Sequence, residues 1–314
     1  VDVRIVIVGA TGHIGTWLVP KLVRRGHDVI AVSRGVRAPY HDFVERRDAQ
    51  RVVLNRDALE HDRSFGPAIA AFGADTVIDL ISFTIDSTTQ IVDALRNGVG
   101  LFIHCGTLWV HGIPPWRPYD ETAPRTPLGD YGIRKAEIEE LLLDEASRGF
   151  PATVLHPGHI TGPGWNPINP AGNLDPLVFT QLASGDKLIL PNDGSATLQH
   201  VHASDVAEAF ALAVDHSSAA IGESFHVAAR EPVTMRSYAE QAAQWFGRDA
   251  NLAFLPWDEF KTTLTDRNAE LTYDHMVHSP HASIDKARRI LGFEPQFTAV
   301  EAAKDAVVSA ENSS

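Results

Sequence analysis

The chain has 314 residues, 44% of them hydrophobic, and its 27 basic and 40 acidic residues give a net charge of −13. This length and composition predict one large α/β domain or two smaller ones, and the charge argues against a protein that binds nucleic-acid backbones in general. The single Cys105 excludes an intrachain disulfide, and no apolar run approaches the roughly 18–20 residues that a membrane span needs. We therefore expect a cytoplasmic protein.

The first predicted element is a buried strand over residues 4–8, which leads into Gly9-x-x-Gly12-x-x-Gly15 and a helix. Glycines at this spacing allow a tight turn, a close approach of backbone to a diphosphate, and packing of the helix on the strand. The helix N-terminus then offers free N–H groups to the phosphates. The alternative is a glycine-rich turn without a ligand, but the flanking strand and helix favour a dinucleotide site.

A second strand is predicted over residues 27–33, and its end is expected to face the adenosine ribose. An acidic residue there would bind a 2′-hydroxyl and repel a 2′-phosphate. This chain has Ser33, Arg34 and Arg37 instead. A hydroxyl and two guanidinium groups suit a phosphate, so NADP(H) is predicted in preference to NAD(H). A solvated basic turn is the alternative.

Strands and helices then alternate along the chain. Further strands are expected at 51–54, 76–81, 101–105, 152–156 and 223–227, and helices at 67–72, 84–96, from 131, and at 204–214, 283–291 and 300–308. A long loop covers 106–129, and the chain is expected to return to the sheet near 199–202. This order predicts an α/β Rossmann fold with a doubly wound parallel sheet. The dinucleotide-binding core is assigned to 1–156, completed by about 199–228, and a smaller substrate-binding region to 157–198 and 229–314.

Tyr131 and Lys135 are four residues apart on a predicted helix and therefore share one face. A nearby ammonium is expected to favour the phenolate form of the tyrosine. Such a tyrosine can exchange a proton with a substrate oxygen while hydride moves at the adjacent carbon. Most Tyr-x-x-x-Lys pairs are ordinary surface residues, and it is the position after the fifth strand that favours a catalytic role here.

Several motifs together resemble the extended short-chain dehydrogenases/reductases, the NAD(P)-dependent epimerase/dehydratase family. They are Gly9-Ala-Thr-Gly-His-Ile-Gly15, Thr107 with Val110-His111-Gly112, Asp120-Glu121-Thr122, Tyr131-Gly-Ile-Arg-Lys135, Pro157-Gly158, Gly162-Pro163, His200-Val-His-Ala-Ser-Asp205 and Leu291-Gly-Phe-Glu-Pro295. The resemblance implies an enzyme in which Thr107 hydrogen-bonds the reacting oxygen, Tyr131 is the acid/base, and Lys135 supports the tyrosine and the cofactor. The implied cofactor contacts are Gly9, Thr11, Gly12, His13, Ile14, Gly15, Ser33, Arg34, Arg37, Asp57, Leu80, Lys135 and His156.

The chain departs from the nucleotide-sugar enzymes of this family at the positions that hold a sugar diphosphate. Leu198 stands where an arginine is usual, and no Arg-x-Gly-Asp segment occurs between residues 262 and 283. We therefore expect an NADP(H)-dependent oxidoreductase that acts on a secondary alcohol or ketone without a nucleotide diphosphate. Two alternatives remain: a nucleotide-sugar epimerase or dehydratase, and a non-catalytic cofactor- or RNA-binding protein of the chloroplast stem-loop-binding branch.

Two further sets of residues have a possible role in a site, the histidines as metal ligands and the tryptophans as walls of a substrate pocket. His200 and His202, and the series His275, His278 and His281, are interpreted as core or surface residues, so no metal is predicted. Trp109, Trp116, Trp165 and Trp257 fit either a substrate pocket or ordinary loop packing. The expected partner is a small molecule, with neither nucleic acid nor membrane, and the sequence is compatible with a homodimer without fixing the oligomeric state.

Overall fold

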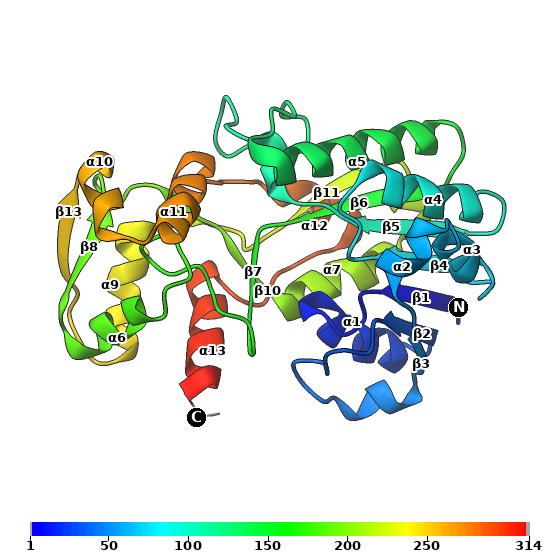
Figure 1. Ribbon diagram of the computed structural model, residues 1–314, viewed down its shortest axis with the longest axis horizontal. Helices are drawn as coiled ribbons and strands as arrows, with labels where there is room; N and C mark the ends of the chain where they lie inside the picture. Colours follow the sequence, from blue (N-terminus) through cyan, green and yellow to red (C-terminus); the bar gives the residue numbers. More distant parts are fainter. Residues whose placement is uncertain (1, 312–314) are drawn as a thin grey trace.

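Seven parallel strands form the central sheet of the protein, whose computed structural model describes residues 2–311 (Figure 1). From one edge to the other they are β3 (Gln50–Val53), β2 (Asp28–Ser33), β1 (Arg4–Val8), β4 (Thr76–Asp79), β5 (Leu101–Cys105), β6 (Ala152–Pro157) and β11 (Ser224–Val227). The central strands are apolar almost throughout because helices cover both faces of the sheet. The predicted Rossmann fold with its doubly wound parallel sheet is confirmed.

Helices form a layer on each face of this sheet (Figure 1). One layer contains α1 (His13–Arg24), α7 (Ala203–Asp215) and α12 (Asp285–Leu291), and the other contains α3 (Phe65–Ala70), α4 (Ile85–Leu95) and α5 (Gly129–Ser147). The short helices α2 (Arg56–His61) and α8 (Ser217–Ala220) complete this part of the molecule. Each layer has its own apolar core against the sheet. No helix within residues 2–311 has the length and apolar character to cross a membrane.

The strand order reverses next to β1, which pairs with β2 on one side and with β4 on the other. Ligands of open α/β sheets bind in the crevice at the carboxyl ends of the strands at such a point. Gly9 follows β1 directly and Leu80 follows β4 directly. The topology therefore places the glycine-rich turn at the crevice.

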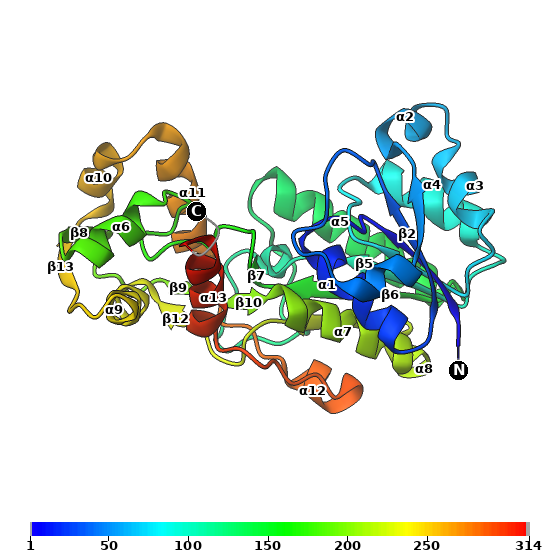
Figure 2. The same ribbon diagram turned by 90° about the horizontal axis from the view of Figure 1, so that it is seen from below.

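A second, smaller lobe lies beside the carboxyl end of the sheet (Figures 1 and 2). It contains the parallel pair β8 (Lys187–Pro191) and β13 (Asn251–Leu255), with α6 (Leu177–Ser184), α9 (Met235–Trp245), α10 (Trp257–Phe260) and α11 (Asp266–His278). The antiparallel pair β9 (Thr197–Leu198) and β12 (Val233–Thr234) and helix α13 (Ala299–Glu311) connect to it. Its buried residues form a core separate from the two cores of the sheet.

One predicted element lies elsewhere than expected. The segment 199–202 does not return to the central sheet, because β11 already occupies the position next to β6. Instead β10 (His200–His202) pairs with β7 (His159–Thr161) in a separate two-stranded sheet beyond the end of β6. This short sheet lies between the central sheet and the second lobe (Figure 2).

The core around α1 gives a direct test of the fold. Leu18 is completely buried between this helix and the sheet. We expect Leu18→Ala to lower the free energy of unfolding by about 2–5 kcal/mol, because truncation loses apolar burial and leaves a cavity. Chemical denaturation measures this change, with Leu177→Ala as the control because Leu177 is 62% exposed. An equal loss in the two variants would contradict the packing described here.

Candidate active site

The glycine-rich turn forms a cradle at the N-terminus of α1. Gly9 has a φ of +94°, and a side chain at Gly15 would bring a Cβ to 2.5 Å from the Gly9 carbonyl oxygen. Both positions therefore require glycine, one for its backbone conformation and the other for close packing of the helix on the turn. Gly12 is the N-cap residue of α1 and has no side chain to cap it. The open N–H groups and missing side chains fit the diphosphate of a dinucleotide.

A cavity of about 280 Å³ extends from this cradle to the end of β5. It brings together many of the predicted residues, namely Gly9, Gly12, His13, Ile14, Gly15, Leu80, Thr107, Tyr131 and Lys135. Thr11 lies on a different cavity, next to the end of β2. The two cavities thus lie on either side of the turn, as the two halves of a dinucleotide would require.

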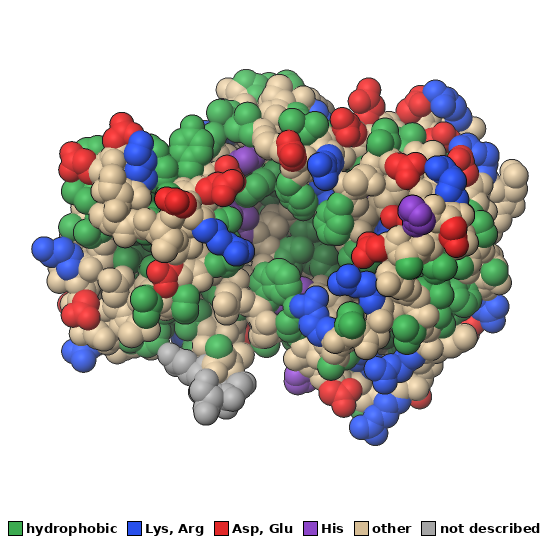
Figure 3. Space-filling model, viewed as in Figure 1, with side chains coloured by type: hydrophobic (Ala, Val, Ile, Leu, Met, Phe, Trp, Pro, Cys, Tyr) green, Lys and Arg blue, Asp and Glu red, His purple; other side chains and the backbone are tan. Residues whose placement is uncertain are grey.

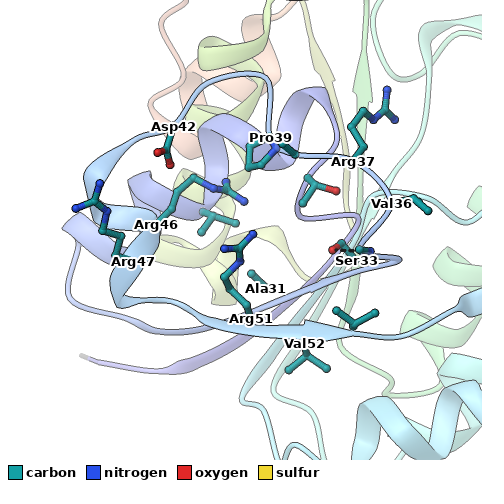
Figure 4. Close-up of a pocket in the computed structure, with 15 residues that line it drawn as sticks. Ala31, Ser33, Val36, Arg37, Pro39, Asp42, Arg46, Arg47, Arg51 and Val52 are labelled. Carbon is teal, nitrogen blue, oxygen red and sulfur yellow. Dashed lines mark hydrogen bonds between the residues drawn. The ribbon is translucent and has the colours of Figure 1, made fainter.

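The cavity next to β2 has a volume of about 420 Å³ and is strongly basic (Figure 4). Ser33 and Arg37, two of the predicted cofactor contacts, line it, whereas Arg34 does not and lies 3.6 Å from the Asp57 carboxylate. Asp57 is exposed in the first turn of α2 and is also outside the cavity. Sequence analysis missed three further arginines that line this cavity, namely Arg46, Arg47 and Arg51.

These arginines come from the segment that links β2 to β3 and from β3 itself. Figure 4 shows Arg46, Arg47 and Arg51 on one side of the cavity and Arg37 on the other. Arg46 donates to the carbonyl oxygens of Ala10, Gly15 and Thr16, and burial lowers its pKa to about 10. Within residues 2–311, none of the four arginines lining this cavity forms an ion pair. The positive charge is offset by a single lining carboxylate, that of Asp42.

Lys135 is almost completely buried at the other end of the site. Its ammonium donates to the carbonyl oxygens of Ser82 and Cys105, each at 2.7 Å, and lies 3.4 Å from His104 Nε2. Burial lowers the pKa of Lys135. Two of its three donors are therefore fixed by backbone, and the third is only loosely engaged.

Tyr131 lies one helical turn before Lys135 on α5, and its environment differs from the expectation. Although 44% of the residue is exposed, burial of the hydroxyl end raises its pKa to about 12, with a further increase from Cys105. A hydrogen bond with Thr107 acts in the opposite direction. Lys135 does not contribute the expected lowering, because its ammonium points to the backbone carbonyls instead. Tyr131 is thus a neutral phenol near pH 7.

Thr107 begins the loop that follows β5. Its hydroxyl oxygen accepts a hydrogen bond from the backbone N–H of Trp109 at 3.3 Å, which caps the short helical turn Leu108–His111. This bond uses one of the two acceptor sites of the hydroxyl and leaves its proton to be donated, to Tyr131 or to a ligand in the cavity. Thr107 and Tyr131 line both the 280 Å³ cavity and a neighbouring one of about 250 Å³.

Figure 3 shows a hollow between the two lobes, and residues that line this neighbouring cavity come from segments on both sides of the β7–β10 sheet. Besides Thr107 and Tyr131 this cavity is lined by Leu108, Trp109, Pro157, Gly158, His159, Ile160, Trp165 and Pro280. No Lys, Arg, Asp or Glu belongs to this lining. Trp116 and Trp257 lie outside it. The cavity therefore favours an uncharged, largely apolar ligand.

Aromatic and imidazole rings surround this end of the site. Trp109 stacks on His278 with ring centroids 4.2 Å apart and meets Tyr131 edge to face. Trp165 stacks on His13, and both residues line the 280 Å³ cavity. Both ring nitrogens of His159 are buried without a hydrogen-bond partner within the described residues. Residues 2–311 contain no group of three His, Cys, Asp or Glu side chains that could hold a metal ion.

His156, like Arg34 and Asp57 among the predicted cofactor contacts, lines none of the three cavities. It is completely buried behind Thr107, where it contacts the Thr107 backbone and the Glu139 carboxylate. Leu198 is also completely buried, in the core of the second lobe. Leu198 thus contributes no charge to the site, although the sequence analysis expects an arginine at this position in nucleotide-sugar enzymes.

Comparisons with known proteins agree with this fold. Residues 5–228 match the model of the NAD dependent epimerase/dehydratase family. The chain is 27% identical over 310 residues to the chloroplast stem-loop binding protein of 41 kDa b of Arabidopsis thaliana, covering 96% of this chain and 78% of the relative. It is also 27% identical over 258 residues to 2′-dehydrokanamycin reductase of Streptomyces kanamyceticus, covering 81% and 69%.

Solved structures show the same architecture. UDP-glucuronic acid 4-epimerase of Bacillus cereus, in complex with UDP-glucuronic acid and NAD, superposes with a TM-score of 0.72. The alignment covers 99% of this chain and 100% of the epimerase at 18% identity, a level that establishes the shared fold alone.

Proposed function

The chain belongs to the NAD dependent epimerase/dehydratase family, and we propose that it is an NADP(H)-dependent oxidoreductase acting at a secondary alcohol or ketone carbon. One observation carries this proposal. Thr107, Tyr131 and Lys135 meet on one cavity with the glycine cradle, and two of them also line an uncharged cavity beside it. A proton donor is thus positioned where a cofactor site and a substrate site adjoin.

The residues of the chain account for the proton in this reaction. A bound nicotinamide supplies or accepts the hydride. In the reducing direction Tyr131, which burial keeps protonated, donates its proton to the substrate oxygen. Thr107 donates a second hydrogen bond to the same oxygen, because the bond that it accepts from Trp109 N–H leaves its hydroxyl proton available. The loosely engaged donor of Lys135 is the one available to the cofactor ribose.

The basic cavity at the end of β2 supports NADP(H) as the cofactor. A 2′-phosphate there would receive hydrogen bonds from Ser33 and from arginines that have no carboxylate partner in the described structure. Arg51 and Arg47 take the place that sequence analysis gave to Arg34. NAD(H) remains the alternative, and it is the cofactor in the complex of the Bacillus cereus epimerase.

The lining of the 250 Å³ cavity supports a substrate without a nucleotide diphosphate. Burying two phosphates without cationic side chains would be costly, and no Lys or Arg lines this cavity. We therefore infer a cyclic or aromatic alcohol or ketone, or a sugar without its nucleotide. The second lobe, together with residues 157–165, is proposed as the substrate-binding region. The relative named as a reductase of 2′-dehydrokanamycin is compatible with this class.

A thermal-shift screen tests the substrate class. With NADP⁺ present, we expect small cyclic alcohols and nucleotide-free sugars to raise the Tm, and UDP- and dTDP-sugars to leave it unchanged. Trp109→Ala is expected to abolish the response, whereas Trp116→Ala, outside the cavity, retains it. Compounds that raise the Tm are then assayed for NADP⁺ reduction by absorbance.

Two other outcomes would favour the alternatives. Stabilisation by UDP- or dTDP-sugars alone would show that other residues clamp a diphosphate, and would favour nucleotide-sugar epimerisation or dehydration. Tight binding of a stem-loop RNA with no response to any small molecule would favour a non-catalytic role, as the name of the Arabidopsis relative suggests for that protein.

A further inference from the structure

Glu139 lies on α5 one turn after Lys135 and two turns after Tyr131, on the same side of the helix. Unlike them it does not line either site cavity, and it is almost completely buried. Its carboxylate contacts two side chains, His156 Nε2 at 3.0 Å and the Arg125 guanidinium. A buried carboxylate this close to the site calls for an explanation, because burying a charge is costly unless it is paired.

Proton positions follow from the hydrogen bonds of His156. The backbone N–H of Thr107 donates to His156 Nδ1 at 3.1 Å, so Nδ1 carries no proton. The proton of the neutral ring must then be on Nε2, from which it is donated to Glu139. Burial alone would raise the pKa of Glu139, but the hydrogen bond from His156 and the charge and hydrogen bonds of Arg125 outweigh it and lower the pKa. Glu139 thus stays ionised and fixes the tautomer of His156.

Arg125 connects the Glu139 carboxylate to the end of the loop that runs from β5 to α5, which we call the catalytic loop. It donates through Nε to Glu139 Oε2 at 3.0 Å and through Nη2 to Oε1 at 2.5 Å. Its Nη1 donates to the carbonyl oxygens of Glu121 and Ala123. The loop between β5 and α5, which carries Thr107 and Trp109, is therefore anchored to Glu139 at both ends. The Glu139 carboxylate holds the beginning of this loop through His156 and the end of the loop through Arg125.

We propose that Glu139 and His156 are positioning residues that fix Thr107 relative to Tyr131 for proton transfer. The inference rests on the proposed function, because only that function gives Thr107 a role toward the substrate oxygen. A chain of two hydrogen bonds connects the helix that carries Tyr131 to the backbone of Thr107. Gly106 is needed for this arrangement, because a Cβ at this position would collide with His156 Nδ1. Displacing Thr107 by a fraction of an ångström would misalign the oxygen between its two donors.

Two substitutions of His156 separate this role from simple packing. In asparagine the amide oxygen is attached to the same carbon position as Nδ1 of histidine, so His156→Asn can still accept from Thr107 N–H. In glutamine the amide group lies one carbon further out and can reach Glu139 but not Thr107. We expect His156→Gln to lower kcat by roughly 5- to 100-fold, the effect of one buried hydrogen bond, with the Kd for NADPH unchanged. His156→Asn should restore most of the lost kcat.

Glu139→Gln has a matched control on the same helix. Glu145 is also buried and is paired with Arg96, but it has no connection to the catalytic loop. We expect both variants to lose stability, and Glu139→Gln alone to lower kcat. Equal kcat losses in Glu139→Gln and Glu145→Gln, or in His156→Asn and His156→Gln, would overturn the inference.

A spectroscopic readout distinguishes this inference from the proposed function. The ¹⁵N spectrum of wild-type protein is expected to show His156 with a bare Nδ1 and a protonated Nε2, and slow exchange of the Thr107 amide that becomes fast in His156→Gln. Neither measurement needs a substrate. A wild-type protein that turns over no compound in the screen refutes the proposed function, whereas the opposite tautomer or an unchanged amide refutes the anchoring itself.

Discussion

Replacing Tyr131 by phenylalanine is expected to lower kcat by about 10²–10⁴-fold, the usual contribution of a general acid. The substitution removes only the hydroxyl, so the ring still packs edge to face against Trp109 and the 280 Å³ cavity keeps its shape. The Kd for NADPH should therefore change by less than about threefold, because the lost group acts on the reacting oxygen and not on uniform binding. Stopped-flow turnover and fluorescence titration measure the two quantities separately.

Tyr273→Phe is the matched control for this experiment. Tyr273 is 48% exposed, close to the exposure of Tyr131, but it lies in the second lobe against Trp257. Its loss should leave kcat unaffected. A Tyr131→Phe variant with full activity on a substrate found in the screen would show that another group transfers the proton.

The pH dependence of the reaction follows from the same tyrosine. Because its pKa is raised to about 12, the phenol remains protonated across the neutral range. Ketone reduction, which needs the acid form, should therefore be nearly constant from about pH 7 to about pH 10, while alcohol oxidation, which needs the base form, should rise. A reduction rate that falls over the same range would indicate that the pKa of Tyr131 is lowered when cofactor is bound.

The fold could be predicted because its signals are local. The strands β1, β2 and β4 are short runs rich in β-branched and apolar residues, and a glycine-rich turn and a helix follow β1 directly. The glycine cradle was predictable for the same reason, since Gly9 and Gly15 are required by backbone geometry within a few residues. Pairing between distant strands was not local. The position of β10 depended on β11 occupying the edge next to β6, which no nearby residue encodes.

The arginines of the basic cavity and the contacts of His156 could not be predicted from the sequence. Arg34 is adjacent to the expected ribose contact, but its side chain pairs with Asp57, whereas Arg51 reaches the cavity from a different strand. Register provides the missing information, because Arg51 lies opposite Ala31 in the pairing of β2 and β3. The family resemblance implied a cofactor contact for His156, yet its ring points to Thr107 and Glu139. Side-chain direction, which spacing alone does not give, decided both cases.

Replacing Arg51 by alanine is expected to weaken NADPH binding by roughly 10- to 100-fold and to leave NADH binding unchanged. Hydrogen bonds to charged groups contribute about 1.5–3 kcal/mol each, and NADH lacks the phosphate that would receive them. The structure supports Arg51 for this role because its guanidinium lines the basic cavity with Ser33 and has no carboxylate partner among residues 2–311.

Arg34→Ala is the informative control, because this arginine was predicted from sequence to contact the phosphate and lies outside the cavity. Its loss should change the ratio of NADPH to NADH affinity by less than about threefold, since exposed ion pairs are worth little. Titration of both cofactors by tryptophan fluorescence, with Trp165 beside the cofactor cavity as a reporter, gives the two ratios. If Arg51→Ala weakened both cofactors equally, the cavity would be binding adenosine through shape alone. If the wild-type protein preferred NADH, the four arginines would have to serve another anion, and the cofactor assignment would revert to NAD(H).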